Sequence, residues 1–275
     1  MSHSHPRSPA ASAPTTRAAG LTTLVIVLCV AASGAAAQEP GPGGPGDGGW
    51  SLGIGAVNKQ DAYKGMDRET TALPLVRYEN EYLKVGGLGL ELKLPGLELG
   101  NAGRVRFGVV GKLELGGYEA DDAPILAGMA ERKGGFWAGA RAEWENALVD
   151  LSAQWTADTS GHSKGQRFSL GLEKKFRLGR QLMVVPYLGA HWLDRKYVGY
   201  YYGVRADEAM AGRAAYAGKA GVNAELGVRT MYLLDRHHSM LLDVSVTGLA
   251  KGIKDSPLVD RSNTNRVVLG YMYRF

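Results

Sequence analysis

The last ten residues of the chain alternate strictly between two kinds of side chain. The odd positions are all apolar or aromatic, and they are Val267, Leu269, Tyr271, Tyr273 and Phe275. The even positions carry two arginines, a valine, a glycine and a methionine. A period of two residues places each set on one face of a β-strand. An unbroken apolar face that ends in three aromatic residues is typical of a strand with lipid on one side and a lumen on the other.

The N-terminal segment has the features of a secretion signal. Arg7 and Arg17 precede a mostly apolar run of twelve residues from Leu21 to Ala32, and Ala35 to Ala37 form the small-residue pattern of a signal-peptidase site. Twelve helical residues rise only about 18 Å, whereas a membrane-spanning helix needs about 20 residues. We therefore predict a signal peptide over residues 1–37, with cleavage near Ala37.

Cys29 suggests a lipoprotein anchor as an alternative, but Leu28 occupies a position that must be small for that cleavage. Cys29 is also the only cysteine of the chain. The predicted mature chain therefore has none, which excludes disulfides, thiol catalysis and cysteine-ligated metals.

About 238 residues remain after the signal, enough for one large β domain. The 39 glycines and 13 tyrosines suit a membrane barrel with kinked strands and aromatic girdles, although a β-sandwich is also compatible with them. No later segment has 18 consecutive apolar residues, so a membrane protein of this sequence must be a closed barrel. We predict an antiparallel transmembrane β-barrel over residues 50–275. Its end resembles the closing strand of outer-membrane barrels, in which aromatics such as Tyr271, Tyr273 and Phe275 are a signal for the barrel-assembly machinery.

Charge and composition outside the barrel give two further expectations. Removing Arg7 and Arg17 from the formal net charge of +5 leaves +3, and the basic residues are scattered, so we expect no nucleic-acid partner. Residues 38–49 are rich in proline and glycine. We predict that they form a tether in the periplasm.

Two-residue alternation interrupted by turn residues continues through the rest of the chain. We predict eleven strands, at 50–57, 71–79, 82–93, 103–118, 134–146, 148–157, 165–177, 181–193, 217–234, 239–251 and 265–275. Bacterial barrels have even strand numbers with both termini in the periplasm. The apolar set changes parity at Gly86–Gly87, where we expect a β-bulge. We therefore place the error near Leu83–Leu99 and prefer twelve strands over ten.

The alternation separates an apolar face from a charged face in most strands. We place the charged face inside, and the candidate lumen residues are Arg104, Arg106, Glu114, Arg141, Glu143, Arg167, Glu173, Arg229 and Asp243. The same face also carries Lys112, Lys175, Arg177, Arg274, Glu145, Asp150 and Glu225. Such a mixture gives no strongly selective field. The interior is either filled by ion pairs or a narrow, mildly anion-preferring pore, and we favour the filled or narrow form.

Several short motifs occur in an order and spacing that are hard to obtain by chance. They are Leu52-Gly53-Ile54-Gly55, Tyr63-Lys64-Gly65, Leu73-Pro74-Leu75-Val76-Arg77-Tyr78, Tyr201-Tyr202-Gly203-Val204, Asp255-Ser256-Pro257-Leu258-Val259 and Gly270-Tyr271-Met272-Tyr273-Arg274-Phe275. This set resembles the MipA/OmpV family, named for the MltA-interacting protein. The resemblance implies a barrel in the Gram-negative outer membrane, in contact with its lipid. For some members it also implies a scaffold that binds a lytic transglycosylase and a peptidoglycan synthase.

The resemblance implies no shared catalytic residues, and we predict no catalytic, cofactor-binding or metal-binding site. His162-Ser163 lies in a loop at 158–165, where adjacent residues do not supply the Ser–His–orienter geometry of a hydrolase. His237-His238 lies in a short turn, and neighbouring imidazoles on a two-residue period point apart. We therefore predict exposed loops at both places.

Four tyrosines cluster before Ala217, and they are Tyr197, Tyr200, Tyr201 and Tyr202. Amphipathic rings are common where a barrel meets the membrane surface. We favour an aromatic girdle at the external interface over a platform for a ligand or partner.

Three classes of function remain open from the sequence. The leading hypothesis is a non-enzymatic scaffold for murein-remodelling enzymes, whose partner surface is the periplasmic turns and the tether. The alternative is a channel permeable to small solutes or antibiotics. The third is an outer-membrane lipid hydrolase, which would need the Ser–His geometry described above.

Overall fold

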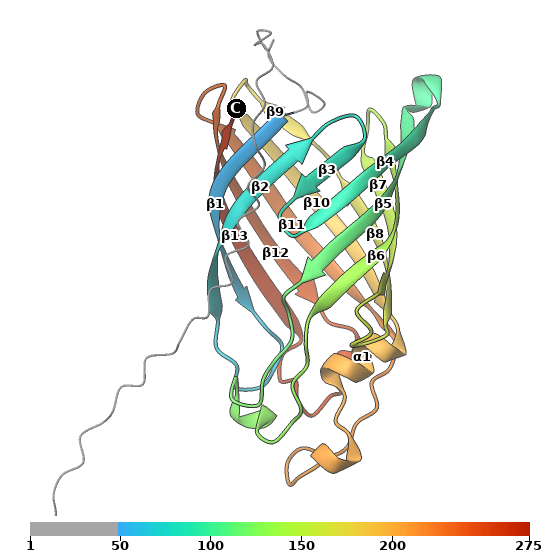
Figure 1. The fold of residues 1–275 in the computed structure, drawn as a ribbon, viewed down its shortest axis with the longest axis vertical. Helices are drawn as coiled ribbons and strands as arrows, with labels where there is room; N and C mark the ends of the chain where they lie inside the picture. The colour runs from blue at the N-terminus through green and yellow to red at the C-terminus, as the bar shows by residue number, and fades with distance from the viewer. Residues whose placement is uncertain (1–48) are drawn as a thin grey trace, which may run out of the picture. The chain divides into compact units, whose positions relative to one another are not determined.

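The computed structural model describes residues 49–275. The predicted signal peptide over residues 1–37 and nearly all of the predicted tether lie outside the described residues. The described part is a β-barrel in which the start of β1 (Gly49–Gln60) and the C-terminal residue lie at the same end (Figure 1). In barrels with an even number of strands this is the periplasmic end. The longer loops lie at the opposite, external end.

The strands follow one another around the barrel in chain order, each antiparallel to its neighbours. After β1 they are β2 (Glu69–Glu79), β3 (Leu83–Gly86), β4 (Gly89–Glu98), β5 (Arg104–Glu114), β6 (Gly135–Glu145), β7 (Asp150–Asp158), β8 (Gln166–Glu173), β9 (Phe176–Leu178), β10 (Leu182–Leu193), β11 (Gly221–Leu233), β12 (His238–Gly248) and β13 (Asn263–Arg274). The sheet closes because β13 pairs with β1 and β10 pairs with β11. Its thirteen segments make twelve strands, because β8 and β9 pair with successive parts of β10. The preferred number of strands is therefore confirmed.

The break between β8 and β9 has a local cause in β10. Lys174 and Lys175, which separate the two segments, lie opposite Pro186 and Val185. Pro186 has no N–H to donate to a neighbouring strand. The hydrogen bond at the break runs from the Lys174 N–H to the Pro186 carbonyl, at 3.2 Å. The predicted strand 165–177 is thus one strand with an interruption.

The predicted strand 82–93 is wrong, because these residues form a hairpin. Gly87 and Leu88 make the turn between β3 and β4. Gly87 has a φ of +58°, a left-handed conformation that glycine adopts without steric penalty. The expected bulge at Gly86–Gly87 is also wrong, since the parity changes where the chain reverses. This hairpin is the origin of the twelfth strand.

The outer and inner faces of the barrel differ in the way that the alternation predicts. Val109 of β5 points outward and is 43% exposed, whereas Val110 lines the cavity inside the barrel. Outward apolar side chains extend around the barrel and include Leu52, Leu92, Phe136, Trp155, Leu170, Leu188, Leu226, Leu242 and Leu269. Such a surface suits contact with the acyl chains of a membrane. No helix among residues 49–275 is long and apolar enough to cross a membrane.

Short helices lie in the connections between strands. The helix α1 (Arg195–Tyr202) and the 3-10 helix η3 (Ala206–Glu208) follow β10, η2 (Pro124–Leu126) follows β5, and α2 (Lys251–Lys254) follows β12. A further 3-10 helix, η1 (Gly100–Ala102), connects β4 and β5. The helix α1 begins where the Asp194 carboxylate accepts a hydrogen bond from the Tyr197 N–H at 2.8 Å. The sequence analysis assigned no helix to residues 194–216, between two predicted strands, and so missed α1.

Candidate functional site

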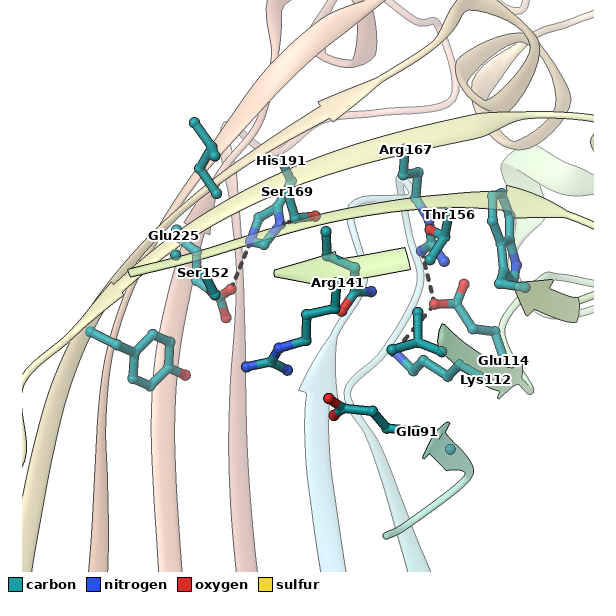
Figure 2. Close-up of a pocket in the computed structure, with 18 of the residues that line it drawn as sticks. Glu91, Lys112, Glu114, Arg141, Ser152, Thr156, Arg167, Ser169, His191 and Glu225 are labelled. Atoms are coloured by element: carbon teal, nitrogen blue, oxygen red, sulfur yellow. Dashed lines mark hydrogen bonds and ion pairs between the residues drawn. The ribbon is translucent and has the colours of Figure 1, made fainter. Parts of the chain in front are cut away.

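A cavity of about 620 Å³ lies inside the barrel, lined by strands from β3 to β8 and by β10 and β11. Charged, hydroxyl and aromatic side chains face it (Figure 2). Two residues of α1, Tyr197 and Tyr202, are part of the lining on its external side. The predicted lumen residues on the lining are Glu114, Arg141, Arg167, Glu173 and Arg229.

One ion-pair group lies toward the external end of the cavity. Arg167 Nη1 is 2.8 Å from Glu114 Oε1, and Lys112 Nζ is 3.2 Å from the same oxygen. The Arg167 guanidinium also lies over the Trp137 ring, 3.8 Å from its centre. A guanidinium over an indole face is attracted by the ring quadrupole. Arg167 is thus held by both a carboxylate and a ring.

A second group lies toward the periplasmic end, on β5 and β6. Arg104 Nε is 2.7 Å from Glu145, and Arg106 contacts both Glu145 and Glu143. Arg141 adds a contact to Glu143 at 3.3 Å. These five side chains alternate in sign across two neighbouring strands. Their charges therefore compensate one another inside the barrel.

A third group connects β8 with β11 and β12. Arg229 Nε is 3.1 Å from Asp243, and its Nη1 is 3.8 Å from Glu173. His191 bridges Glu225 at 3.0 Å and the Ser169 hydroxyl at 2.9 Å. All nine predicted lumen residues thus take part in ion pairs, and the paired charges leave no strong field of one sign. Their role in function stays a prediction.

The sequence reasoning missed the polar residues of the β3–β4 hairpin. Lys84 and Glu91 line the cavity, and Glu79 forms an ion pair with Lys93 at 2.8 Å. They were missed because the prediction treated residues 82–93 as one strand, although these residues belong to two strands of opposite direction. The pair Gly86–Gly87 between two alternating runs is the signal that would have revealed the hairpin.

The external loops pack into a cap with an apolar core of its own. Tyr63, Tyr118, Leu126, Val204 and Leu258 are buried together, although they come from four different loops. Hydrogen bonds connect the same loops, since the Tyr63 hydroxyl donates to the Tyr201 carbonyl at 3.0 Å. The cap is therefore a folded unit over the external end of the barrel.

A buried ion pair holds the cap together. Arg132 and Glu208 are 2% and 5% exposed, and Arg132 Nη2 lies 2.8 Å from both carboxylate oxygens. Burial opposes ionisation of Glu208, but hydrogen bonds from the Arg205 N–H and from Arg132 outweigh it, so the pKa of Glu208 is lowered. Burial also raises the pKa of the neighbouring Tyr118 to about 12, with Arg132 opposing the shift.

The tyrosines of α1 lie in this cap, so the favoured girdle at the membrane interface is not what the structure has. Tyr197 packs edge-on against Trp137 with ring centres 5.7 Å apart, and Tyr202 stacks on Tyr63 at 5.5 Å. The Tyr201 hydroxyl donates to the Lys133 carbonyl at 3.1 Å. The helix α1 determines where these tyrosines point, and a prediction without a helix does not anticipate it.

The sequence comparison decides the family. The profile described as MltA-interacting protein MipA matches residues 52–275, which is the whole barrel except its first residues. The chain belongs to the MipA family. This confirms the resemblance that the motifs indicated.

Relatives within the family are distant but nearly full-length. Outer membrane protein OmpV of Vibrio cholerae is 26% identical over 230 residues, covering 83% of this chain and 88% of that protein. The MltA-interacting protein of Escherichia coli K12 is 26% identical over 237 residues, covering 83% and 91%. With the family match, these relatives place the barrel in the Gram-negative outer membrane. Among solved structures, an outer membrane channel from Pseudomonas putida F1 has a TM-score of 0.43 at 12% identity, covering 87% of this chain and 100% of that one.

The terminal aromatic residues of this MipA-family chain lie at the periplasmic end of β13. Tyr271 and Phe275 point outward, at 40% and 66% exposed. Tyr273 contacts the Phe275 ring edge-on at 5.1 Å and stacks on His237 at 5.7 Å. The Phe275 N–H donates to the Trp50 carbonyl at 3.1 Å. Their role as an assembly signal stays a prediction.

The histidine candidates have local structural partners. His162 Nδ1 is 2.5 Å from the Gly134 carbonyl, and the neighbouring Ser163 hydroxyl donates to Asp158 at 2.8 Å. His237 Nδ1 is 2.9 Å from the Arg274 carbonyl. Within residues 49–275, no three His, Cys, Asp or Glu side chains lie close enough together to hold a metal ion.

Proposed function

We propose that this barrel is a non-enzymatic scaffold that holds murein-remodelling enzymes, a lytic transglycosylase and a peptidoglycan synthase, at its periplasmic rim. The matched family is described by an interaction with MltA, and the Escherichia coli relative carries the same name. Murein enzymes act on the periplasmic side of the outer membrane. The partner surface therefore has to lie on the short turns of that side.

The main support is the packed cap over the external end. An open pore needs a continuous water-filled path. Here Tyr197 and Tyr202 line the external side of the cavity, and the charged side chains below them are joined in ion pairs. A closed barrel of this kind suits an anchor better than an open channel.

The cavity of about 620 Å³ favours a second candidate, a channel for small solutes or antibiotics. Conduction would require α1 to move away from the lumen and pairs such as Arg167–Glu114 to separate. Single-channel recordings on the refolded barrel in planar bilayers test this directly. We expect no stable conductance, and reproducible openings of fixed size would favour the channel.

Exposed apolar side chains on the periplasmic turns support a partner surface there. Tyr82 and Leu148 are 67% and 72% exposed at the tips of their turns, and Leu234 is also exposed. Turn residues usually carry small or polar side chains. Large apolar groups in these positions offer anchor points for a partner protein.

The experiment is a binding assay between the refolded barrel and a purified lytic transglycosylase. We expect Tyr82→Ser and Leu148→Ser to weaken binding. Met210→Ser is the control, because Met210 is also a large exposed apolar residue, at 56%, but lies in the external loop after β10. Loss of binding in the Met210 variant alone would overturn the proposal. So would hydrolysis of lipid by the refolded barrel, which would support the hydrolase instead.

A further inference from the structure

The wall of the barrel is incomplete beside β2. The strand β3 is four residues long and pairs with β2 only from Arg77 to Glu79. The other residues of β2, 69–76, pair with β1 on one side and with no other strand among residues 49–275. In Figure 1 the β3–β4 hairpin ends part-way along β2, and β5 is the next long strand beyond it. The gap lies in the external half of the wall.

Pro74 fits this unpaired edge. It lies opposite Ile54 of β1, in the middle of β2. Proline has no N–H for a ladder, so within sheets it is confined to edges and irregular positions. A strand edge without partners is unfavourable in lipid, because the bilayer core offers no hydrogen bonds. The unpaired stretch of β2 therefore forms an open edge in the barrel wall.

A band of the inner surface next to the open edge of β2 is apolar, whereas charged residues predominate on the inner face of β4–β8. A row of inward-facing positions in register crosses β10, β11, β12, β13, β1 and β2. Its members are Met183, Met231, Leu241, Gly270, Gly55 and Leu73. A Cβ added to Gly270 would meet the side chains of Leu75 and Leu241, so these two also share the inner face. These residues form an apolar band across six strands, and Arg229 and Asp243 lie beside it on the same inner face.

The cavity lies next to this apolar band, although the residues of the row are not part of its lining. Arg229 lines the cavity, and Met231 follows it on the same face of β11. On the other side, Lys84, Gly86 and Gly89 of the hairpin beside β2 also line the cavity. The cavity therefore extends from the charged wall to the incomplete wall.

Arg141 offers an unfilled charged anchor in the cavity. Its Nε is buried without a hydrogen-bond partner, and its ion pair is a single contact to Glu143 at 3.3 Å. Figure 2 shows its guanidinium extending into the space between the walls. Glu143 and Glu225 nearby are already paired, with Arg106 and with His191. Glu91, the other carboxylate close by, lies across from Lys84 in the register.

We propose that the cavity binds an amphiphile with one acyl chain and an anionic head, which enters from the membrane through the incomplete wall beside β2. The chain lies along the apolar row that ends at Leu73, and the head binds Arg141. The volume of the cavity lies within the range of ligand sites in proteins. This site does not depend on a murein enzyme binding at the rim.

The test uses an 18-carbon fatty acid carrying a photoreactive diazirine, added to the full barrel in lipid nanodiscs. Cross-linked residues are identified by mass spectrometry, with the corresponding fatty alcohol as the head-group control. We expect the acid, but not the alcohol, to label inward residues such as Leu73, Met231 and Leu241. Equal labelling by both, or labelling of outward residues only, would overturn the proposal.

Two variants address the head and the entrance separately. Arg141→Gln should lower inward labelling about tenfold or more, as expected for loss of a charged hydrogen-bond partner. Its control is Arg104→Gln, which removes an arginine outside the cavity lining. Gly86→Trp places bulk beside the open edge of β2, where an added Cβ has no atom within 4 Å. Its control is Gly49→Trp, at a position that is equally free of contacts. Unchanged labelling in Gly86→Trp, with normal heat-modifiable migration, would contradict entry beside β2.

Discussion

The two ends of the barrel are built in different ways. At the external end, loops from four hairpins share one apolar core and a buried ion pair. At the periplasmic end, each of three turns is held by one of its own side chains. Asn80 accepts hydrogen bonds from the N–H groups two and three residues later, and Asn146 and Asp235 do the same.

This difference separates stability from binding. A turn closed by a local Asx hydrogen bond depends on few other residues. A cap that joins distant loops is cooperative, so one substitution affects all of them. We therefore expect external substitutions to alter folding, and periplasmic ones to alter contacts with partners.

The largest effect should come from the terminal strand, whose periplasmic end is neither part of the cap nor one of the three turns. Deleting Phe275 should reduce the assembled barrel in the outer membrane far more than its single exposed ring would suggest. The reason is the predicted recognition of this residue by the assembly machinery. Heat-modifiable migration of the membrane fraction is the measurement, with Phe275→Trp as the aromatic control. Normal yield of the deletion variant would rule out the signal.

The next effect should be at the buried ion pair of the cap. Glu208→Ala leaves Arg132 buried without its carboxylate, which typically costs about 3 to 5 kcal/mol. Glu131→Ala, in the loop of Arg132, is the control, because the ion pair of Glu131 is exposed and should contribute no more than about 1 kcal/mol. Urea unfolding in lipid vesicles measures both. Equal, small losses would show that the cap is not a cooperative unit.

The contrast between the ends also explains what the sequence could predict. The faces of β5 and β13 follow from alternation, because membrane and lumen select opposite side chains on a strand. The cap does not follow, because Arg132 and Glu208 are 76 residues apart and meet only through tertiary packing. The hairpin at Gly87 was missed because β3 has only four residues, so that the change of parity at Gly86–Gly87 was interpreted as a bulge.

Between the two ends, a charge placed on either face of β5 tests which face of the barrel wall contacts lipid and which faces the cavity. Val109→Arg puts a cation toward lipid and should cost about 2 to 4 kcal/mol near the bilayer midplane. Val110→Arg enters the charged cavity and should cost less. The same unfolding assay compares the two. Equal losses would mean that the inward and outward faces are misassigned.

Acid should loosen the external end before the rest of the barrel. The pKa of Glu208 in the folded cap lies below its usual 4.5. Its contribution to stability is therefore complete above that value and is lost as the pH falls through the lowered pKa. Hydrogen exchange at the Val204 amide, which is bonded to the Tyr216 carbonyl, reports on the cap. The acceleration of exchange at low pH should be smaller in Glu208→Gln than in the unsubstituted protein. An identical acid response in both proteins would contradict this origin.

The smallest effect on folding should come from the periplasmic turn at residues 235–238. Asp235→Ala removes two turn hydrogen bonds on an exposed carboxylate and should leave the free energy of unfolding nearly unchanged. Asp235→Asn keeps an acceptor and should have a still smaller effect.

If the periplasmic rim is the partner surface, replacing all four residues 235–238 should nevertheless weaken binding of a lytic transglycosylase, and so should deleting residues 39–49. Co-purification with folded variants measures this, with Lys251→Ala in the exposed part of α2 as the external control. Intact binding after both rim changes would move the partner surface away from the periplasmic end.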